Sequence, residues 1–200
     1  MSYPFWKRTI DLSGAILGLF AIAPLVPVIV LAIVVETRGG AIVKLERISE
    51  GNVIRVYKFR SMVHDAEARK PELLHLNERS DGPFFKIRRD PRVTRTGRII
   101  RKFRIDEFPQ LVNVLKGELA LVGPRPHEPG EVSKYPDEHK PILSERAGVT
   151  GYSQVNGASS LSFMKELEFD KYYIESMSPM FDMKIIVKTI SILFFDPTAV

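Results

Sequence analysis

Leu12–Val35 reads LSGAILGLFAIAPLVPVIVLAIVV, and none of its residues carries a charge. As a single helix rising 1.5 Å per residue, the stretch would measure about 36 Å, which is enough to cross a hydrocarbon core of about 30 Å. It is longer than the apolar core of a signal peptide, about 7–15 residues, and no clear small-residue cleavage site follows it. We interpret the stretch as a membrane helix.

Two prolines, Pro24 and Pro27, lie near the middle of this stretch. Proline removes a backbone donor and clashes with the preceding turn, so we expect the helix to kink or break there. Two topologies stay open. A re-entrant helix, residues 1–36, would bend near Pro24 and leave the membrane on the side it entered. Alternatively, one span would pass straight through with a mild kink, because spanning helices tolerate proline.

Basic residues flank the apolar stretch at both ends. They are Lys7 and Arg8 before it, and Arg38, Lys44 and Arg47 after it. An excess of basic residues normally marks the cytoplasmic side of a membrane, so both ends look cytoplasmic. This symmetry favours re-entry, and it makes Lys7 and Arg8 candidate anchors at the membrane interface.

The rest of the chain is polar and basic. The 200 residues carry a net charge of +5 with a pI of about 9.4, a balance that favours anionic partners: lipid head groups, nucleotide phosphates or nucleic acid. The length suits one domain with its own core. The chain has no cysteine, which excludes disulfides and thiolate chemistry.

We expect residues 37–200 to form a compact, helix-rich α/β catalytic domain. Alternating apolar and polar residues around Glu50-Gly51-Asn52 predict a small β-hairpin. The predicted helices are His64–Glu78 with a break near Pro71, one or two helices within Thr94–Leu115, Glu166–Met177, and Met183–Phe195. The last of these is strongly apolar, so it either packs in the core or lies as an amphipathic helix in the membrane interface.

Asp106 and Glu107 are adjacent carboxylates shortly before Pro109. Because proline is tolerated in a first helical turn, a helix closed by Gly117 is expected to start near Asp106. The helix dipole favours ionised carboxylates there and also attracts phosphate. The pair is therefore either a stabilising feature of a first turn or a catalytic pair, and position alone favours the first.

A basic segment precedes this pair. Its arginines recur at every third position: Arg89, Arg92, Arg95, Arg98, Arg101 and Arg104. The segment could be a solvated face, or it could bind anionic lipid, a pyrophosphate or nucleic acid. Beside a membrane helix, lipid contact is favoured over DNA contact, and aromatic residues are not interleaved with the cations as a single-strand platform requires.

Three further cations are candidates for holding phosphate. Arg125 lies between two prolines in the sequence GPRP, which stiffens the loop and orients the guanidinium. Lys58 and Arg60 lie on one face of an expected strand, YKFRSM, where two cations repel unless an anion lies between them. For Lys58 and Arg60 taken alone, ordinary exposure on a sheet is the simpler interpretation.

Motifs for other chemistry are missing from the sequence. The four histidines, His64, His75, His127 and His139, show no metal-ligand spacing, and there is no Walker loop, GxGxxG or GxSxG motif. Carboxylate chemistry at a phosphate is the best-supported option. A carboxylate can attack phosphorus to form an acyl phosphate, and Mg²⁺ would offset the repulsion between the two anions.

Five segments together resemble the bacterial sugar transferase family, the monotopic phosphoglycosyl transferases. They are Lys7-Arg8 before a proline-bent membrane helix, YKFRSM, DEFPQLVNVLKGELALVGPRP, RAGVTGYSQVNG and DKYYIESMSPMFDMKII, in the family's order and over nearly the whole chain. The length resembles the family's minimal form, without a polytopic N-terminal domain. Two positions depart from the family's pattern: Ala23 precedes Pro24 where serine is common, and Ala147 stands in place of a proline.

The resemblance implies transfer of a sugar-1-phosphate from a nucleoside diphosphate sugar, usually a UDP-sugar, to polyprenyl (undecaprenyl) phosphate, with release of UMP. It implies that Asp106 is the nucleophile and forms a covalent phosphosugar intermediate with Mg²⁺ bound close to it, and that Glu107 assists. Pro24 corresponds to the break in a re-entrant helix. The residues that correspond to phosphate- or substrate-binding positions are Lys58, Arg60, Arg125 and Arg146.

The resemblance also implies a location and partners. We expect the bacterial inner (cytoplasmic) membrane, with the catalytic domain on the cytoplasmic face, in the first membrane step of a glycoconjugate or polysaccharide pathway. Membrane lipids and other glycan-assembly enzymes are expected partners, and nucleic acid is not. Two rival interpretations stay open: a membrane-tethered nucleic-acid-binding protein that uses the arginine segment, and a scaffold subunit that binds polyprenyl phosphate without catalysis.

Overall fold

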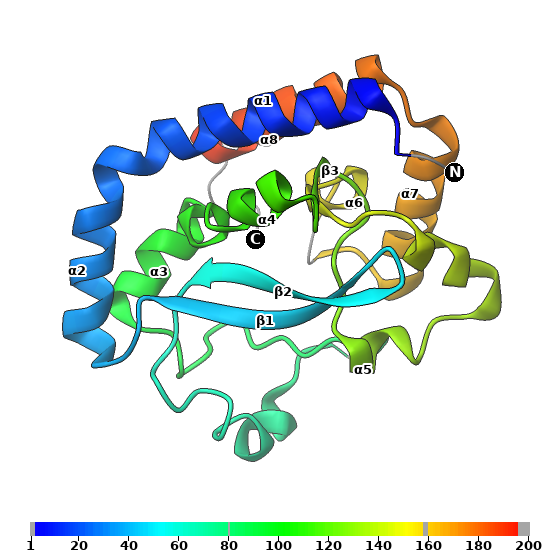
Figure 1. Cartoon of the computed structure of the whole chain (residues 1–200). Coiled ribbons are helices and arrows are strands. Elements are labelled where there is room, and N and C mark those ends of the chain that lie inside the picture. The colour runs from blue at the N-terminus through cyan, green and yellow to red at the C-terminus, as the bar shows by residue number, and fades with distance from the viewer. Residues whose placement is uncertain (1–2, 80, 158–159, 196–200) are drawn as a thin grey trace.

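A sharp bend divides the N-terminal apolar segment into two helices. The computed structural model of the protein describes residues 3–79, 81–157 and 160–195. Helix α1 spans Phe5–Ile22, a 3-10 turn spans Ala23–Leu25, and α2 spans Val26–Thr37. Figure 1 shows α1 along the top of the molecule and α2 turning down from its end. Pro24 and Pro27 each lie in the first turn of a new segment, where a missing N–H costs least, so the predicted break near Pro24 is confirmed.

The two helices expose apolar side chains over much of their surface. Within the described residues, one helical run, Phe5–Thr37, is long and apolar enough by length and composition to cross a membrane. Its exposed large apolar side chains are Phe5, Ile16, Leu17, Phe20, Leu25, Val28, Leu31, Val34 and Val35. The other side of α1 packs on the domain, where Ala15 is fully buried among Leu111, Val114 and Leu119. The segment is therefore part of the fold on one side and suited to lipid on the other.

The predicted hairpin is confirmed. Strand β1 (Ile42–Ser49) pairs antiparallel with β2 (Asn52–Phe59) along their whole length. The two turn residues, Glu50 and Gly51, have φ values of 49° and 71°. Two successive residues with positive φ match the right-handed twist of the strands, which fixes the register.

The acid pair lies on a turn of its own and does not start a helix. Helix α3 spans Arg95–Lys102, a 3-10 turn (η3) spans Ile105–Glu107, and α4 spans Gln110–Lys116. Pro109 has no N–H to bond to the carbonyl of Ile105, so regular α-helical bonding cannot pass through the acids. Arg104 takes a left-handed conformation, φ 51°, which ends the preceding helix. The predicted helix start near Asp106 is thus wrong, whereas the two helices within Thr94–Leu115 are confirmed.

A second small sheet joins two distant parts of the chain. Strand β3 (Ala120–Val122) pairs parallel with β4 (Gly148–Thr150), which the sequence analysis did not predict. Gly123 follows β3 directly, and a Cβ there would lie 2.6 Å from the carbonyl oxygen of Arg146. Only glycine allows this close approach of two backbones, which fixes where the GPRP loop leaves the sheet.

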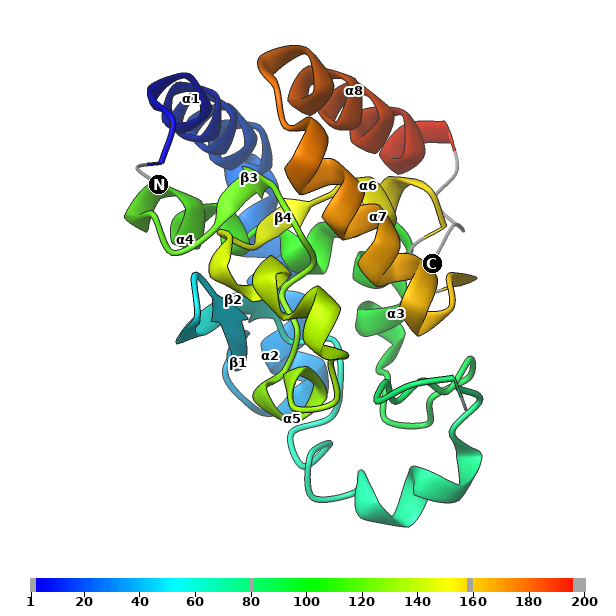
Figure 2. The ribbon, with the colours of Figure 1, turned by 90° about the vertical axis from the view of Figure 1, so that its right-hand side faces the viewer.

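The C-terminal half is helical. The remaining helices are η4 (Asp137–Ser144), α5 (Pro129–Val132), α6 (Tyr152–Val155), α7 (Phe163–Ser176) and α8 (Pro179–Phe195). The predicted helices Glu166–Met177 and Met183–Phe195 are confirmed, each with an earlier start. Figures 1 and 2 both show α8 running beside α1. Helix α8 exposes Met180, Met183, Val187 and Ile190, while its Ile185 is buried against Tyr173 and Val122.

The predicted helix His64–Glu78 is mostly wrong. Residues 64–70 form turns, and only Pro71–Leu76 is helical, as a 3-10 helix (η2). Leu74 and Leu76 are exposed, so this segment has no packed apolar side. Because a short helix without tertiary packing is marginal in water, the local pattern does not produce a regular α-helix.

Both N-terminal cations are held inside the protein. The Lys7 ammonium is 2.6 Å from Asp182 of α8, and it also donates to the hydroxyl of Tyr173 and the carbonyl of Val122. Lys7 is 3% exposed and Asp182 is fully buried. Arg8 donates to the carbonyls of Val114 and Leu115 at the end of α4. These contacts hold α1 against the domain. The sequence predicted a different role for Lys7 and Arg8, as anchors at the membrane interface, and the structure instead shows both side chains bonded to the protein.

Replacing Lys7 with methionine is expected to be strongly destabilising, because it leaves the buried Asp182 carboxylate without its counter-ion. The free energy of unfolding should fall by about 3–5 kcal/mol, and the thermal midpoint in detergent by about 6–20 °C. Lys184→Met is the matched control, since Lys184 is exposed on the same helix as Asp182. The double variant Lys7→Met/Asp182→Leu should regain much of the loss. Equal midpoints for Lys7→Met and Lys184→Met would contradict the role of this ion pair.

Candidate active site

A cavity of about 1230 Å³ lies between β2, the segment 78–93, α3 and the loop after β3. Ten basic side chains line it: Arg47, Lys58, Arg79, Lys86, Arg88, Arg89, Arg98, Arg101, Lys102 and Arg125. Six carboxylates share the wall: Glu78, Asp90, Glu107, Glu128, Glu131 and Glu166. The positive excess suits a ligand with several negative charges, such as a diphosphate.

Glu107 and Lys58 meet in this wall. The Lys58 ammonium lies 2.6 Å from Glu107 Oε1, and both side chains are about a quarter exposed (25% and 28%). Lys58 is the penultimate residue of β2, so the hairpin carries the cation and η3 carries the acid. Asp106 is the half-buried neighbour of Glu107 and is not among the side chains that line the cavity. Of the pair, Glu107 lines the cavity, and Asp106 is its direct neighbour in η3.

The two acids differ in pKa. Burial raises the pKa of Asp106 to about 6, and the neighbouring Glu107 carboxylate adds to this, while Lys58 and Arg101 oppose it. Burial also disfavours the charged form of Glu107, but the Lys58 ammonium outweighs it and lowers the pKa of Glu107. Glu107 is therefore the first of the pair to ionise. Asp106 ionises near pH 6, so it is largely a carboxylate at neutral pH.

The backbone of Arg125 is bonded to a buried acid of α7. Its N–H donates to Asp170 Oδ2 (3.1 Å), and the hydroxyl of Ser153 donates to the other oxygen of Asp170 (2.7 Å). The Arg125 side chain is 40% exposed, and its Nε lies 3.8 Å from Glu166 Oε1. Its charge also contributes to the lowered pKa of Glu107. Arg125 therefore lies close to Glu166 and also acts on Glu107 through its charge.

The arginines that recur at every third position do two different things: some line the cavity, and one stabilises the fold. Arg89, Arg98 and Arg101 line the cavity, and Arg101 also donates to the hydroxyl of Ser61 (2.8 Å). Arg92 instead forms a buried ion pair with Asp90 (2.6 Å), which stabilises the loop before α3. The regular three-residue spacing does not put these side chains on one face, because turns interrupt the segment before and after α3.

Two residues expected at the site lie apart from the cavity wall. Arg60 follows β2 and donates to the carbonyl of Gly40 (2.7 Å). Arg146 pairs with Glu50 at the hairpin turn (2.9 Å), and its guanidinium stacks 3.8 Å from the centroid of the Tyr3 ring. Neither side chain lines the cavity in this structure. Of the predicted phosphate-binding cations, the structure brings Lys58 and Arg125 to the acid pair.

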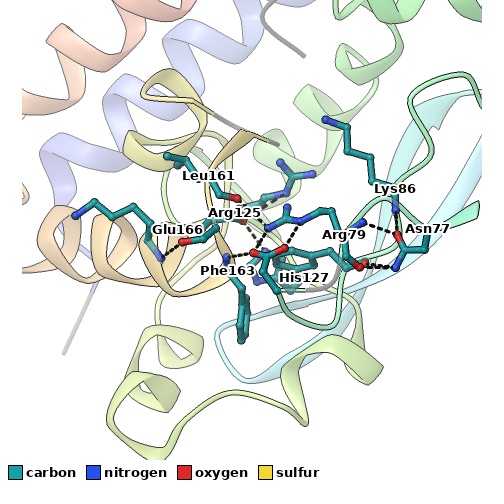
Figure 3. A network of polar contacts seen from close by, with 12 residues as sticks. Asn77, Arg79, Lys86, Arg125, His127, Leu161, Phe163 and Glu166 are labelled. Atoms are coloured by element: carbon teal, nitrogen blue, oxygen red, sulfur yellow. Dashed lines mark hydrogen bonds and ion pairs between the residues drawn. The ribbon is translucent and has the colours of Figure 1, made fainter.

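Several wall residues were not predicted. Figure 3 shows Arg79, Arg125, His127 and Glu166 in one polar network beside the segment 77–86. Arg79 forms a forked ion pair with Asp81 (3.1 and 3.0 Å) and donates to the carbonyl of Leu161. His127 directly follows the GPRP motif, which is the one sequence signal that could have identified it.

Mg²⁺ is compatible with the site as a shared ion. Within the part of the chain that the structure describes, no three His, Asp or Glu side chains cluster as metal ligands. Mg²⁺ is nevertheless commonly bound by one or two carboxylates together with substrate phosphates. Because Glu107 is engaged by Lys58, Asp106 is the carboxylate that could supply such a ligand.

The chain thus combines a basic cavity, with Glu107 of the acid pair in its wall, and an apolar bent helix, a combination that suits a protein with a phosphate-bearing ligand. The family model for bacterial sugar transferases matches residues 2–196. The chain therefore belongs to the bacterial sugar transferase family.

Curated relatives agree with this assignment. The chain is 40% identical over 189 residues to the galactosyl transferase CpsE of Streptococcus agalactiae, covering 94% of this chain and 42% of the relative. It is 37% identical over 194 residues to the undecaprenyl-phosphate galactose phosphotransferase of Salmonella typhimurium, covering 94% and 40%. It is 34% identical over 189 residues to the exopolysaccharide production protein ExoY of Sinorhizobium fredii, covering 92% and 83%. The chain thus spans about two fifths of the length of several relatives.

The names of further relatives differ in the sugar. One from Komagataeibacter xylinus is an undecaprenyl-phosphate glucose phosphotransferase, and one from Aeromonas hydrophila is an N-acetylgalactosaminephosphotransferase. Family membership therefore leaves the sugar open. The relatives' names and the apolar N-terminal run together indicate membrane association.

The buried Asp170 predicts a pH dependence of stability. Burial raises its pKa to about 7, and the nearby Glu166 carboxylate adds to this. Between about pH 4 and 7 the folded protein holds a proton that the unfolded chain has lost, so stability falls as pH rises, by at most about 1.4 kcal/mol per pH unit. Asp170→Asn should remove this slope, measured as the difference in unfolding free energy between the two proteins. Asp137→Asn, a change at an exposed acid, is the control and should leave the slope in place; a slope that survives Asp170→Asn would contradict the assignment.

Proposed function

We propose that this protein transfers a sugar-1-phosphate from a UDP-sugar to polyprenyl (undecaprenyl) phosphate and releases UMP. The observation that carries the proposal is the contact between Lys58 and Glu107 in the wall of a cavity lined by ten cations, with Arg125 beside it. Membership of the bacterial sugar transferase family supports it. The relatives named for UDP-galactose and undecaprenyl phosphate support the choice of donor and acceptor.

We assign the nucleophile to Asp106. Its carboxylate attacks the phosphorus that bears the sugar, a P–O bond to the carboxylate forms, and the P–O bond to UMP breaks so that UMP leaves with the electron pair. A polyprenyl phosphate oxygen then attacks the same phosphorus and frees the Asp106 carboxylate. The half-buried position of Asp106 supports this role, because a partly desolvated carboxylate loses little hydration on attack.

The remaining groups orient the substrates and neutralise the charge of their phosphates. Lys58 keeps Glu107 anionic, which suits Glu107 to accept a proton from, or to orient, the acceptor phosphate. Arg125, held by its backbone on Asp170, is placed to bind the diphosphate as it gains charge. Mg²⁺, when bound by Asp106 and the substrate phosphates, would offset the repulsion between the carboxylate and the diphosphate.

Asp106→Asn and Glu107→Gln are both expected to abolish UMP release while the unfolding midpoint stays near that of wild type. The assay combines a UDP-sugar, Mg²⁺ and polyprenyl phosphate in detergent, with EDTA as a control that should also stop turnover. In the wild type without acceptor, mass spectrometry should find a phosphosugar adduct on Asp106. Full activity of Asp106→Asn would refute the nucleophile, and tight binding of polyprenyl phosphate without UMP release from any UDP-sugar would favour a scaffold role.

We further propose that α1 and α2 form a re-entrant helix in the bacterial inner membrane, with the catalytic domain on the cytoplasmic face. The bend at Ala23–Leu25 and the contacts that pin α1 to the domain support this topology. Helix α2 also ends against the domain, where Glu36 accepts from the backbone N–H groups of Arg95 and Thr96 at the start of α3. Because both ends of the bent segment contact the same domain, both are expected on the same side of the membrane.

Single cysteines test this topology, since the native chain has none. Ser2→Cys and Gly40→Cys are expected to react with a membrane-impermeant maleimide only after the inner leaflet is made accessible. In spheroplasts, labelling of one variant but not the other would establish a straight-through span and refute re-entry. Activity of each variant in the UMP assay serves as the folding control.

A further inference from the structure

Glu166 is a buried carboxylate in the wall of the cavity. It lies on α7, its side chain is 2% exposed, and it stands among the cavity-lining residues. His127 Nε2 lies 2.9 Å from Glu166 Oε1, and Arg125 Nε lies 3.8 Å from the same oxygen. Both contacts engage Oε1, so among the described residues Oε2 has no donor. An acid buried at this depth normally uses both of its oxygens.

Two buried residues, His127 and Tyr135, fix the orientation of Glu166. His127 is 3% exposed and bonds through Nδ1 to the hydroxyl of Tyr135, which is also buried. With Nε2 donating to the carboxylate, Nδ1 accepts from the tyrosine O–H, and this chain of bonds fixes the tautomer of His127. Glu166 is thus held by a Tyr–His relay that leaves one oxygen for a ligand.

Glu166 is also kept anionic. Burial disfavours its charge, but the bond from His127 and the positive charges of Arg125 and Arg79 outweigh burial and lower the pKa of Glu166. An anion in this cavity repels phosphate. A UDP-sugar carries no cationic group, so the donors that it offers to Glu166 are its hydroxyls and N–H groups, and bonds from such donors to a carboxylate are stronger than those between neutral groups.

The place of Glu166 in the cavity points to the sugar. Arg125, which is placed to bind the diphosphate, lies 3.8 Å from Glu166, and its charge also lowers the pKa of Glu107 in the same cavity wall. In a UDP-sugar, the sugar is bonded directly to the phosphorus that is attacked, whereas the uracil lies beyond a second phosphate and a ribose. Phe84 lines the same wall, 4.9 Å from the His127 ring between centroids, and the Arg79 guanidinium lies over its ring, 4.6 Å from the centroid.

We propose that Glu166 accepts a hydrogen bond from a hydroxyl of the donor sugar, and that it is a specificity-determining residue of the transferase. The proposal rests on the proposed function for the identity of the donor. His127 and Tyr135 are positioning residues for Glu166. A carboxylate that faces one hydroxyl discriminates between sugars that differ at that carbon, which is the difference between the relatives named for glucose and galactose.

A simpler role for Glu166 is to balance the charge of Arg125. That role predicts that loss of the carboxylate disturbs Arg125 and weakens every diphosphate ligand equally. Recognition of the sugar predicts that a UDP-sugar is weakened while UDP and UMP are not. A carboxylate that reads the uracil instead would weaken UMP and UDP as well. The three roles therefore separate in binding measurements made without the acceptor lipid.

Glu166→Gln is the decisive variant. The glutamine carbonyl can still accept from His127, which turns the cavity-facing atom from an acceptor into an N–H donor. We expect the Kd for the preferred UDP-sugar to rise about tenfold or more, with the Kd values for UDP and UMP changed less than about twofold. Glu168→Gln is the matched control, because Glu168 lies on the same helix, outside the cavity and exposed. It should leave all three values unchanged.

Deoxy analogues identify the hydroxyl. The preferred donor is chosen from UDP-glucose, UDP-galactose and their N-acetylamino forms by UMP release, or by binding if no UMP is released. One deoxy-UDP-sugar should bind wild type about tenfold more weakly than its parent, and this difference should vanish in Glu166→Gln. If glutamine prevents folding, Glu166→Asp serves instead, since it keeps the charge but withdraws the oxygen.

The outcomes separate the two proposals. Absence of UMP release by wild type with every donor refutes the proposed function, while the binding series still decides the role of Glu166. Equal weakening of UDP-sugar and UDP assigns Glu166 to Arg125, and weakening of UMP assigns it to the base. Either of these results, or a deoxy effect that persists in Glu166→Gln, overturns sugar recognition by Glu166.

Discussion

The buried ammonium of Lys7 joins the apolar helix to the site. It bonds to Asp182 of α8, to Tyr173 of α7 and to the carbonyl of Val122, the last residue of β3. Three residues later the chain reaches Arg125. A charge so deeply buried is tolerated only with this full set of partners, so the relative positions of α1, α7, α8 and β3 are fixed together. The segment suited to lipid and the loop that carries Arg125 thus share one rigid connection.

The two acids of the pair, Asp106 and Glu107, have unequal pKa values, and this difference matters for the proposed chemistry. Lys58 contacts one acid of the pair, and this holds Glu107 ionised while Asp106 keeps the higher pKa. Two adjacent carboxylates in the same environment would not be assigned different roles by their pKa values. The Lys58 ammonium makes the two pKa values differ. A carboxylate that is partly desolvated and forms no ion pair with the described residues suits attack, and one that is paired suits proton handling or orientation. The asymmetry comes from the hairpin, which brings Lys58 to η3.

Local signals in the sequence predicted local structure well. The prolines predicted the break at Pro24, and Glu50-Gly51 predicted the hairpin turn, because a missing N–H and a positive φ act within a few residues. The predicted helix start near Asp106 is wrong because Pro109 has no N–H to donate to the carbonyl four positions earlier, so the α-helix begins only after the proline. Lys58 and Arg60 were grouped by strand alternation, but β2 ends at Phe59, and Arg60 turns to the carbonyl of Gly40. The pairing of β3 with β4 depends on a close approach of distant backbones, which no local pattern encodes.

Helix α7 shows why the role of a buried acid is hard to predict from a sequence. Glu166 and Asp170 are one turn apart on the same face, and both are buried beneath the loop of Arg125. Both oxygens of Asp170 accept donors from the protein, so it serves the loop. Glu166 has donors at one oxygen only, within the described residues, and this difference decides which acid can serve a ligand. In the proposed mechanism the phosphate chemistry uses the same cations and acids for every donor, whereas the proposed recognition of the sugar uses a single acceptor, which fits a family whose members are named for different sugars.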